Sequence, residues 1–159
     1  MLISRILIAF DGSEISQRAL DYAVKFAECW GAELTILVVV PRVMMPLPLR
    51  AYLNGFGRMH VNSTRKLSQD QEKMRTAYQK ILTEVEERVR LEHPRLKAML
   101  RLEEGPPSST IVDIAEDEGF DIVVIGSRGL GYLRGLILCS TSNHVTKSCS
   151  KPVLIVKHH

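Results

Sequence analysis

Short apolar runs recur along the chain and are separated by longer stretches with helical periodicity. The runs are rich in Ile, Leu and Val and are bounded by turn residues, a pattern typical of strands buried within a sheet. The sequence therefore predicts five strands, at residues 5–10, 34–40, 98–102, 121–125 and 152–156. The 98–102 run is less apolar than the others, which favours a position at the edge of the sheet.

Amphipathic helices are predicted between these strands. Ser13 is a good N-cap residue, Glu14 places an acid in the first turn, and Gly31 is a stop signal, so a helix is expected from about 14 to 30. A second apolar stripe predicts a helix over about 68–92, and its members are Met74, Tyr78, Ile81, Leu82, Val85 and Val89. Two shorter helices are expected, one between residues 105 and 119 and one over about 140–148.

Residues 41–66 interrupt this pattern. They combine three prolines and two glycines with apolar side chains such as Met44, Tyr52 and Phe56. A connection of this length is uncommon within a compact domain. We expect an irregular insertion folded over its own apolar side chains, with a lid over a ligand or a dimer contact as the alternatives.

The alternation of strands and helices predicts one α/β domain over residues 1–159. The expected architecture is doubly wound and Rossmann-like, with a five-stranded, mostly parallel sheet in the order 3-2-1-4-5 and helices on both faces. Such sheets bind ligands beyond the carboxyl ends of the strands, where the strand order reverses. With the first and fourth strands adjacent, Asp11 and Gly126 face the same crevice.

Composition excludes several classes of partner. The formal net charge is +3, and the basic residues are scattered rather than clustered, which argues against nucleic acid as a partner. No apolar run approaches the length of a membrane span. The chain starts with a strand-like segment rather than a leader, and its three cysteines form no CxxC pair, so we expect a cytoplasmic protein.

A glycine-rich loop follows the fourth strand and leads into a helix that opens on Ser140-Thr141-Ser142. Glycine lets the backbone approach an anion closely and adopt positive φ. A helix N-terminus adds free N–H groups and a favourable dipole. The pattern predicts a site for the phosphate chain of a nucleotide.

With these features the chain resembles the universal stress protein family, in particular its nucleotide-binding branch. The resemblance runs nearly end to end, with residues 6–13, 114–129 and 151–156 carrying it, and only residues 41–70 fall outside it. The family's ATP signature is a glycine, two residues, a second glycine, nine residues, then a glycine followed by Ser or Thr. Gly126, Gly129 and Ser140 match it, whereas Cys139 stands where the third glycine belongs.

The resemblance implies ATP binding with Mg²⁺ or Mn²⁺ and a homodimer formed through the last strand, Val153–Val156. It places Asp11 beside the ribose or a metal-bound phosphate, the Val39 backbone at the adenine edge, and the Ser140 and Thr141 hydroxyls on the β- and γ-phosphates. The implied nucleotide-binding residues are Ala9, Asp11, Val39, Gly126, Ser127, Arg128, Gly129, Leu130, Gly131, Tyr132, Ser140, Thr141 and Ser142. Arg134 is a further candidate to place charge near the phosphates.

Cys139 leaves other functions open. Its side chain can intrude on the phosphate path, in which case the chain acts through dimerisation and contacts with a downstream protein. The thiol itself is either a small, partly buried hydrophobe or a redox sensor. An enzyme such as an adenylate-forming protein or a pyrophosphatase is a third possibility, but the loop signature of those enzymes is missing.

Catalytic and metal-binding motifs are also missing from the sequence. No nucleophile–base–acid set is present, so we expect no enzyme beyond, at most, slow ATP hydrolysis. The five histidines show no metal-ligand spacing, and His158 and His159 are read as a polar tail or the remnant of a tag.

Overall fold

The computed structural model describes residues 3–42, 59–127 and 140–157. Five parallel strands form one sheet in the order β3-β2-β1-β4-β5. Their bounds are Arg5–Ala9 (β1), Glu33–Val40 (β2), Ala98–Glu104 (β3), Ile122–Gly126 (β4) and Val153–Val156 (β5). The predicted strands, the strand order and the edge position of the less apolar strand are confirmed.

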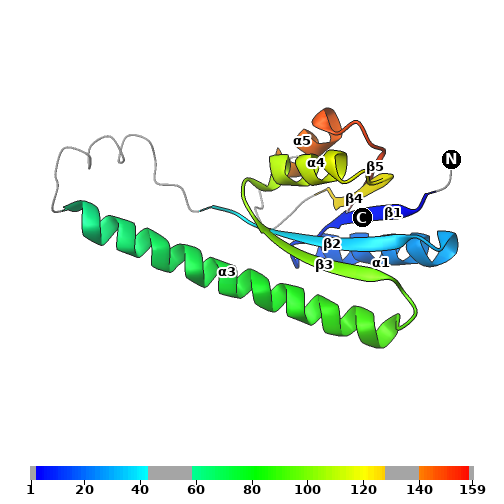
Figure 1. Cartoon of the computed structure of the whole chain (residues 1–159), viewed down its shortest axis with the longest axis horizontal. Helices are drawn as coiled ribbons and strands as arrows, with labels where there is room; N and C mark the ends of the chain where they lie inside the picture. Colours follow the sequence, from blue (N-terminus) through cyan, green and yellow to red (C-terminus); the bar gives the residue numbers. More distant parts are fainter. Residues whose placement is uncertain (1–2, 43–58, 128–139, 158–159) are drawn as a thin grey trace.

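Helices cover both faces of the sheet (Figure 1). One face carries α1 (Glu14–Trp30) and α3 (Met59–Glu92), and the other carries α4 (Pro107–Asp117) and α5 (Ser140–Ser148). The first two crossovers therefore pass over one face and the last two over the opposite face. The direction in which successive strands are added to the sheet therefore reverses between β1 and β4, which lie side by side at its centre.

The alternation of side chains along β1 divides the core into two layers. Ile6 and Ile8 are fully buried against the α1 and α3 layer, whereas Leu7 is fully buried on the α4 and α5 side. Successive strand side chains point to opposite faces, so a strand covered on both sides is apolar throughout. The long apolar run of β2 has the same explanation.

The ends of α1 follow the sequence prediction. The Ser13 hydroxyl accepts a hydrogen bond from the Ser16 backbone N–H at 3.3 Å. Gly31 ends the helix in the left-handed conformation, with φ of 63°, and donates its N–H to the Ala27 carbonyl. These caps fix where the chain leaves β1 and where it enters β2.

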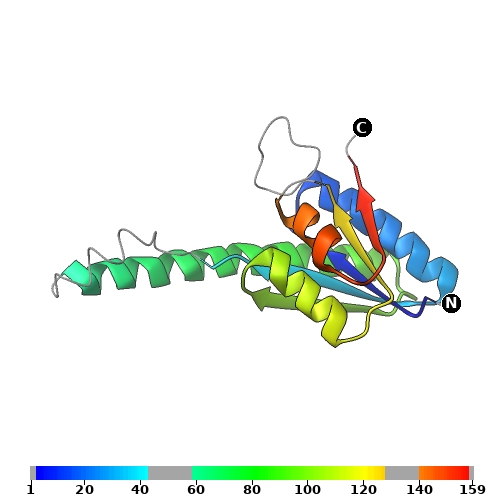
Figure 2. The ribbon, with the colours of Figure 1, turned by 90° about the horizontal axis from the view of Figure 1, so that it is seen from above.

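The start of α3 differs from the prediction. The helix begins at Met59 rather than near Ser68, so residues 59–66 are helical and not part of an irregular insertion. This segment lacks glycine and proline but also lacks the apolar stripe from which the helix was predicted. The stripe is missing because this end of α3 projects beyond the sheet instead of packing on it (Figure 2). Residues 43–58 lie outside the described part of the chain.

Candidate functional site

The central strand ends before its neighbours. The ladder between β1 and β2 stops at the Ala9–Leu37 pair, and the ladder between β1 and β4 stops at Ala9–Ile125. Beyond this point β2 continues beside β3 to Val40, and Gly126 of β4 still pairs with Val156. The carboxyl edge of the sheet is therefore stepped at β1.

This step coincides with the reversal of the strand order between β1 and β4. Doubly wound sheets bind ligands at this position, because the connections leave the two strands toward opposite faces and free the space between them. Of the predicted site residues, Ala9 ends β1, Val39 lies near the end of β2, and Gly126 ends β4. The structure thus brings these three to one edge.

The turn after β1 holds a single carboxylate at this edge. Asp11 Oδ1 accepts a hydrogen bond from the Ser13 backbone N–H at 3.0 Å, which fixes the side chain over its own turn. Gly12 has a φ of +82°, a conformation that side chains disfavour. The turn then delivers the chain to Ser13, the N-cap of α1.

Ser127 and Ser142 join the end of β4 to the first turn of α5. The Ser127 N–H donates to the Val156 carbonyl at 2.8 Å, and the Ser142 hydroxyl donates to the Ser127 carbonyl at 3.1 Å. Both side chains are almost fully buried. These hydrogen bonds hold the N-terminus of α5 next to Gly126.

Ser140 and Thr141 open α5 at the same edge. Ser140 is exposed and Thr141 is half-buried, so both differ from the buried Ser142. The first N–H groups of a helix have no partner within it and favour an anion. The predicted residues Arg128, Gly129, Leu130, Gly131 and Tyr132, with Arg134 and Cys139, lie outside the described residues.

The helix α3 also reaches this edge, which the sequence analysis did not predict. A Cβ built on Gly12 would lie 3.1 Å from Cγ2 of Ile81, so α3 packs directly on the turn after β1. Burial raises the pKa of Tyr78, and the negative charge of Asp11 raises it further. The sequence contains no sign that α3 reaches this edge, because Tyr78 and Ile81 belong to the apolar stripe and were interpreted as core residues.

Charged groups at the opposite, amino edge are engaged with one another. Asp121 Oδ2 accepts from the backbone N–H groups of Ser4 and Arg5 at 2.7 and 2.9 Å, and these hydrogen bonds lower the pKa of Asp121. Glu118 pairs with both Arg5 and Arg101. This cluster ties the starts of β1 and β4 to the middle of β3 and has a structural role.

The described residues contain no group of three His, Cys, Asp or Glu side chains placed to hold a metal ion. Nor does any helix within residues 3–42, 59–127 and 140–157 combine the length and apolarity needed to span a bilayer.

Comparison with known proteins agrees with this architecture. The model of the universal stress protein family matches residues 3–157. The chain belongs to this family. The universal stress protein YxiE of Bacillus subtilis is 30% identical over 156 residues, covering 98% of this chain and all of YxiE.

Solved structures of universal stress proteins share the fold. The protein UspA from Lactobacillus plantarum superposes with a TM-score of 0.78 at 21% identity, covering 98% of this chain and 99% of the other. A universal stress protein in complex with cAMP gives a TM-score of 0.63 at 23% identity, covering 99% and 98% of the two chains. The chain therefore shares the fold of these structures.

Proposed function

We propose that this universal stress protein binds an adenine nucleotide, ATP, at the carboxyl edge of β1 and β4 and serves as a stress-response or signalling module. The observation that carries the proposal is the step in the sheet where the strand order reverses, because Asp11, Gly126 and the start of α5 lie at this edge. A nucleotide needs anion-binding groups for its phosphates and hydrogen-bonding groups for its ribose and base, and residues of both kinds lie at this edge.

The phosphates fit best against the start of α5. The exposed Ser140 hydroxyl and the N–H groups of the first turn of α5 would form the anion site, and the Ser142–Ser127 hydrogen bond fixes that turn beside Gly126. The signature residues Gly126 and Gly129 precede this helix in the sequence. Asp11, on the turn after β1, would accept hydrogen bonds from the ribose hydroxyls.

Mg²⁺ or Mn²⁺ would reach the site with the nucleotide. Asp11 is the carboxylate that the described residues place on the turn after β1, and one carboxylate is a usual protein contribution to a magnesium–phosphate site. The phosphates and water would supply the remaining oxygen ligands. We therefore expect metal to strengthen nucleotide binding and not to bind tightly by itself.

Two solved structures with this fold support the choice of an adenine nucleotide. Besides the complex with cAMP, a family member from Arabidopsis thaliana, 15% identical with a TM-score of 0.61, was solved with AMP bound. These observations concern those proteins and show what the fold can accommodate.

A module that acts only through protein contacts is the second candidate, and Cys139 is the observation that favours it. Cysteine at the position where the signature has glycine adds a Cβ and a sulfur atom, which would narrow the path of the phosphates if they point toward it. If the backbone there needs a left-handed φ, the substitution also costs on the order of 1–2 kcal/mol.

Calorimetry with Mg-ATP separates the two candidates, using the native chain, Cys139→Gly and Cys139→Ser. Micromolar binding by the native chain supports the nucleotide-binding module. Binding by Cys139→Gly alone indicates a closed site and a function in protein contacts. Cys139→Ser retains the Cβ and removes the sulfur, so it shows which of the two atoms obstructs the ligand. No binding by any of the three overturns the nucleotide proposal.

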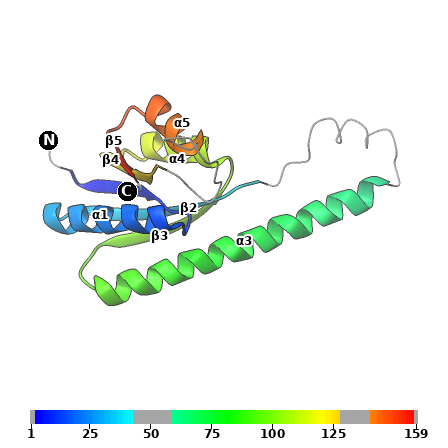
Figure 3. The same ribbon diagram turned by 180° about the vertical axis from the view of Figure 1, so that it is seen from behind.

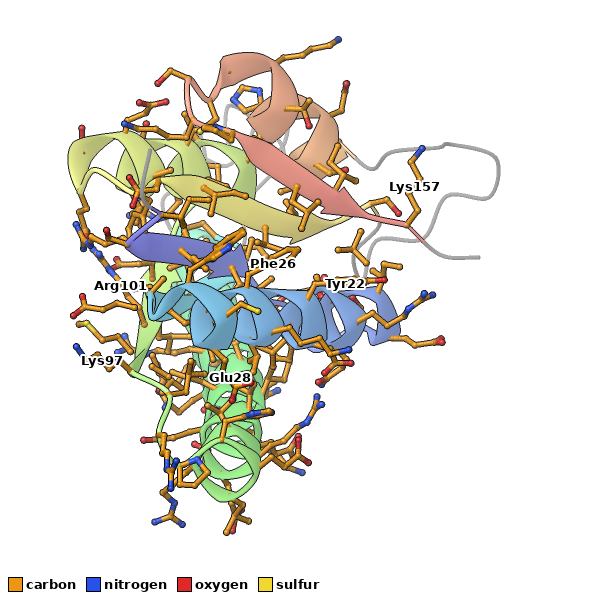
Figure 4. All side chains as sticks on the ribbon, turned by 90° about the vertical axis from the view of Figure 1, so that its right-hand side faces the viewer. Tyr22, Phe26, Glu28, Lys97, Arg101 and Lys157 are labelled. Atoms are coloured by element: carbon orange, nitrogen blue, oxygen red, sulfur yellow. The ribbon has the colours of Figure 1, made fainter. Side chains whose placement is uncertain are left out.

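We also propose that the protein forms a homodimer through β5. The carbonyls of Pro152 and Val156 accept hydrogen bonds from Val123 and Ser127, in and just after β4, and backbone groups alternate in direction along a strand. The backbone N–H and C=O groups of Val153 and Ile155 therefore point away from β4, while their side chains pack on the core. Figure 4 shows Lys157 after β5 and two aromatic side chains of α1, Tyr22 and Phe26. Trp30 stacks on Phe26 and is 43% exposed, so α1 adds apolar surface beside this edge.

A further inference from the structure

The helix α1 carries a row of aromatic side chains along one flank. Tyr22, Phe26 and Trp30 are spaced four residues apart, so they follow one another on the helix surface. The ring centroids of Tyr22 and Phe26 are 6.4 Å apart, and those of Phe26 and Trp30 are 4.9 Å apart with an angle of 10° between the rings. Tyr22 and Trp30 are 45% and 43% exposed. Apolar groups that are contiguous on a surface, unlike scattered ones, mark an interaction site.

The opposite flank of α1 faces α3, and both helices lie on the same face of the sheet (Figure 3). Asp21 Oδ1 lies 2.7 Å from a guanidinium nitrogen of α3, and Glu28 Oε1 lies 2.8 Å from Nδ1 of His93, the residue after α3. Figure 4 shows Glu28 on the side of α1 toward α3, and Tyr22 and Phe26 on the side toward β5. The aromatic row therefore lies on the flank of α1 that faces away from α3, beside the edge strand.

The aromatic row is continuous with β5. Phe26 and Leu154 pack against the same core layer, between the sheet and the helices α1 and α3. Among the described residues β5 pairs with β4 alone, so its other side is an open edge of the sheet. The row and the open edge thus form one surface, made by Tyr22, Phe26, Trp30 and Val153–Val156.

A dimer joined through the β5 edge alone would have a small interface. A stable interface buries about 800 Å² on each partner. β5 has four residues, so its edge is about 13 Å long and, with a depth of about 10 Å, covers roughly 130 Å². Lys151 and Lys157 flank the strand, and an antiparallel pair would bring these like charges close together. Additional area has to come from the surface beside β5, and an aromatic side chain can bury about 150–250 Å².

Two-fold symmetry would bring two such aromatic rows together. Edge strands that pair antiparallel are related by an axis perpendicular to the sheet, so the α1 helices of both copies would lie on the same face. Adjacent strands are about 4.8 Å apart, which sets the two β4 strands, three spacings apart, at about 14 Å. Since α1 packs most extensively on β4, the two α1 helices would have a similar separation. This exceeds the separation of about 8–10 Å in ordinary helix pairs, and large aromatic side chains can fill the difference.

We propose that Tyr22, Phe26 and Trp30 of α1 pack against the same row of a second copy of this chain, so that two antiparallel α1 helices close the dimer beside the paired β5 strands. The inference rests on the proposed homodimer and adds the surface that supplies most of its buried area. Stacking holds the three rings in place before association, so little side-chain freedom is lost when the two copies meet.

The fluorescence of Trp30 tests the inference directly, because Trp30 is the only tryptophan of the chain. As dilution converts the dimer to monomer, we expect its emission to shift to longer wavelength and its quenching by acrylamide to increase. Both changes should follow the mass measured by light scattering over the same concentrations. Emission and quenching that stay constant while the mass halves would overturn the inference, because Trp30 would then have the same surroundings in both states.

A charge within the row should weaken the dimer. Tyr22→Lys places a charge among the aromatic rings, and Leu91→Lys places the same charge on an exposed apolar position of α3 as the matched control. We expect the dissociation constant of the dimer to rise at least about tenfold in Tyr22→Lys, as at a central aromatic position of an interface, and to stay unchanged in Leu91→Lys. The thermal midpoint of each variant shows that both are folded.

The outcomes also separate this inference from the proposed dimer through β5. If Val153→Lys is monomeric and Tyr22→Lys associates as tightly as the native chain, the inference fails and the β5 dimer stands. If the native chain is a monomer up to millimolar concentration, the proposed dimer fails and the inference fails with it.

Discussion

Gly12 links the turn after β1 to α3 and shows how one residue constrains the site. Its φ of +82° favours glycine, and the space where a Cβ would lie is occupied by Ile81. Gly31 also has positive φ, of +63°, but nothing lies within 4 Å of the Cβ it lacks. Both glycines therefore adopt a backbone conformation that favours glycine, but only Gly12 is crowded by a neighbouring side chain.

Substituting these glycines tests the contact between the turn and α3. We expect Gly31→Ala to lower the free energy of unfolding by about 1 kcal/mol, the cost of left-handed backbone alone. Gly12→Ala should cost about 2–3 kcal/mol, because overpacking against Ile81 is added. Urea denaturation of the two variants measures both. Equal losses would show that α3 does not press on this turn.

The residues whose roles depend on neighbours in sequence were predictable. Ser13 and Gly31 act as caps as expected, because capping needs only the local backbone. The burial of Ser142 and the contact of Ile81 with the turn at Gly12 were not predictable, since both depend on how a helix packs on the sheet.

The element that departs most from its expected form is α3. Its C-terminal part packs through Leu82, Val85 and Val89, and Arg88 joins it to α1 by contacting Gln17 and Asp21. Sequence periodicity detected this docked part correctly. Residues 59–67 gave no periodic signal, because hydrophobic periodicity reports packing and not helix formation itself.

Two leucines on α3 test where the helix is anchored. Leu82 is 8% exposed and lies in the core, whereas Leu91 is 69% exposed. We expect Leu82→Ala to lower the free energy of unfolding by about 2–4 kcal/mol, through lost burial and a residual cavity. Leu91→Ala should change it by no more than about 0.5 kcal/mol. Chemical denaturation monitored by circular dichroism gives both values, and a large effect at Leu91 would contradict the docking described here.

At the scale of the whole molecule, the parallel sheet with helices on both faces followed from general rules of chain connection. Alternating strands and helices leave few arrangements open, and the reversal between β1 and β4 fixed the edge at which Asp11 and Gly126 meet. The contribution of α3 to that edge did not follow, because no rule relates the length of a crossover helix to the side chains it brings near a ligand.

The proposed dimer through β5 predicts the mass of the protein in solution. Light scattering at micromolar concentration should give twice the chain mass of 17.9 kDa. A charge on an edge strand opposes pairing with a second strand, so Val153→Lys should be monomeric. Met99→Lys is the control, because it places the same charge on β3 at the other edge, where Met99 is 64% exposed. A dimeric Val153→Lys would show that the chains associate elsewhere.

The central claim is that an adenine nucleotide binds at the carboxyl edge of β1 and β4. Titration of ¹⁵N-labelled protein with Mg-ATP, followed by the amide signals in NMR spectra, tests both binding and place. The account predicts shifts at Asp11, Gly12, Gly126 and Ser140, and unchanged signals at the amino edge, for example at Arg5. Shifts centred on the amino edge, or none at millimolar Mg-ATP, would contradict it.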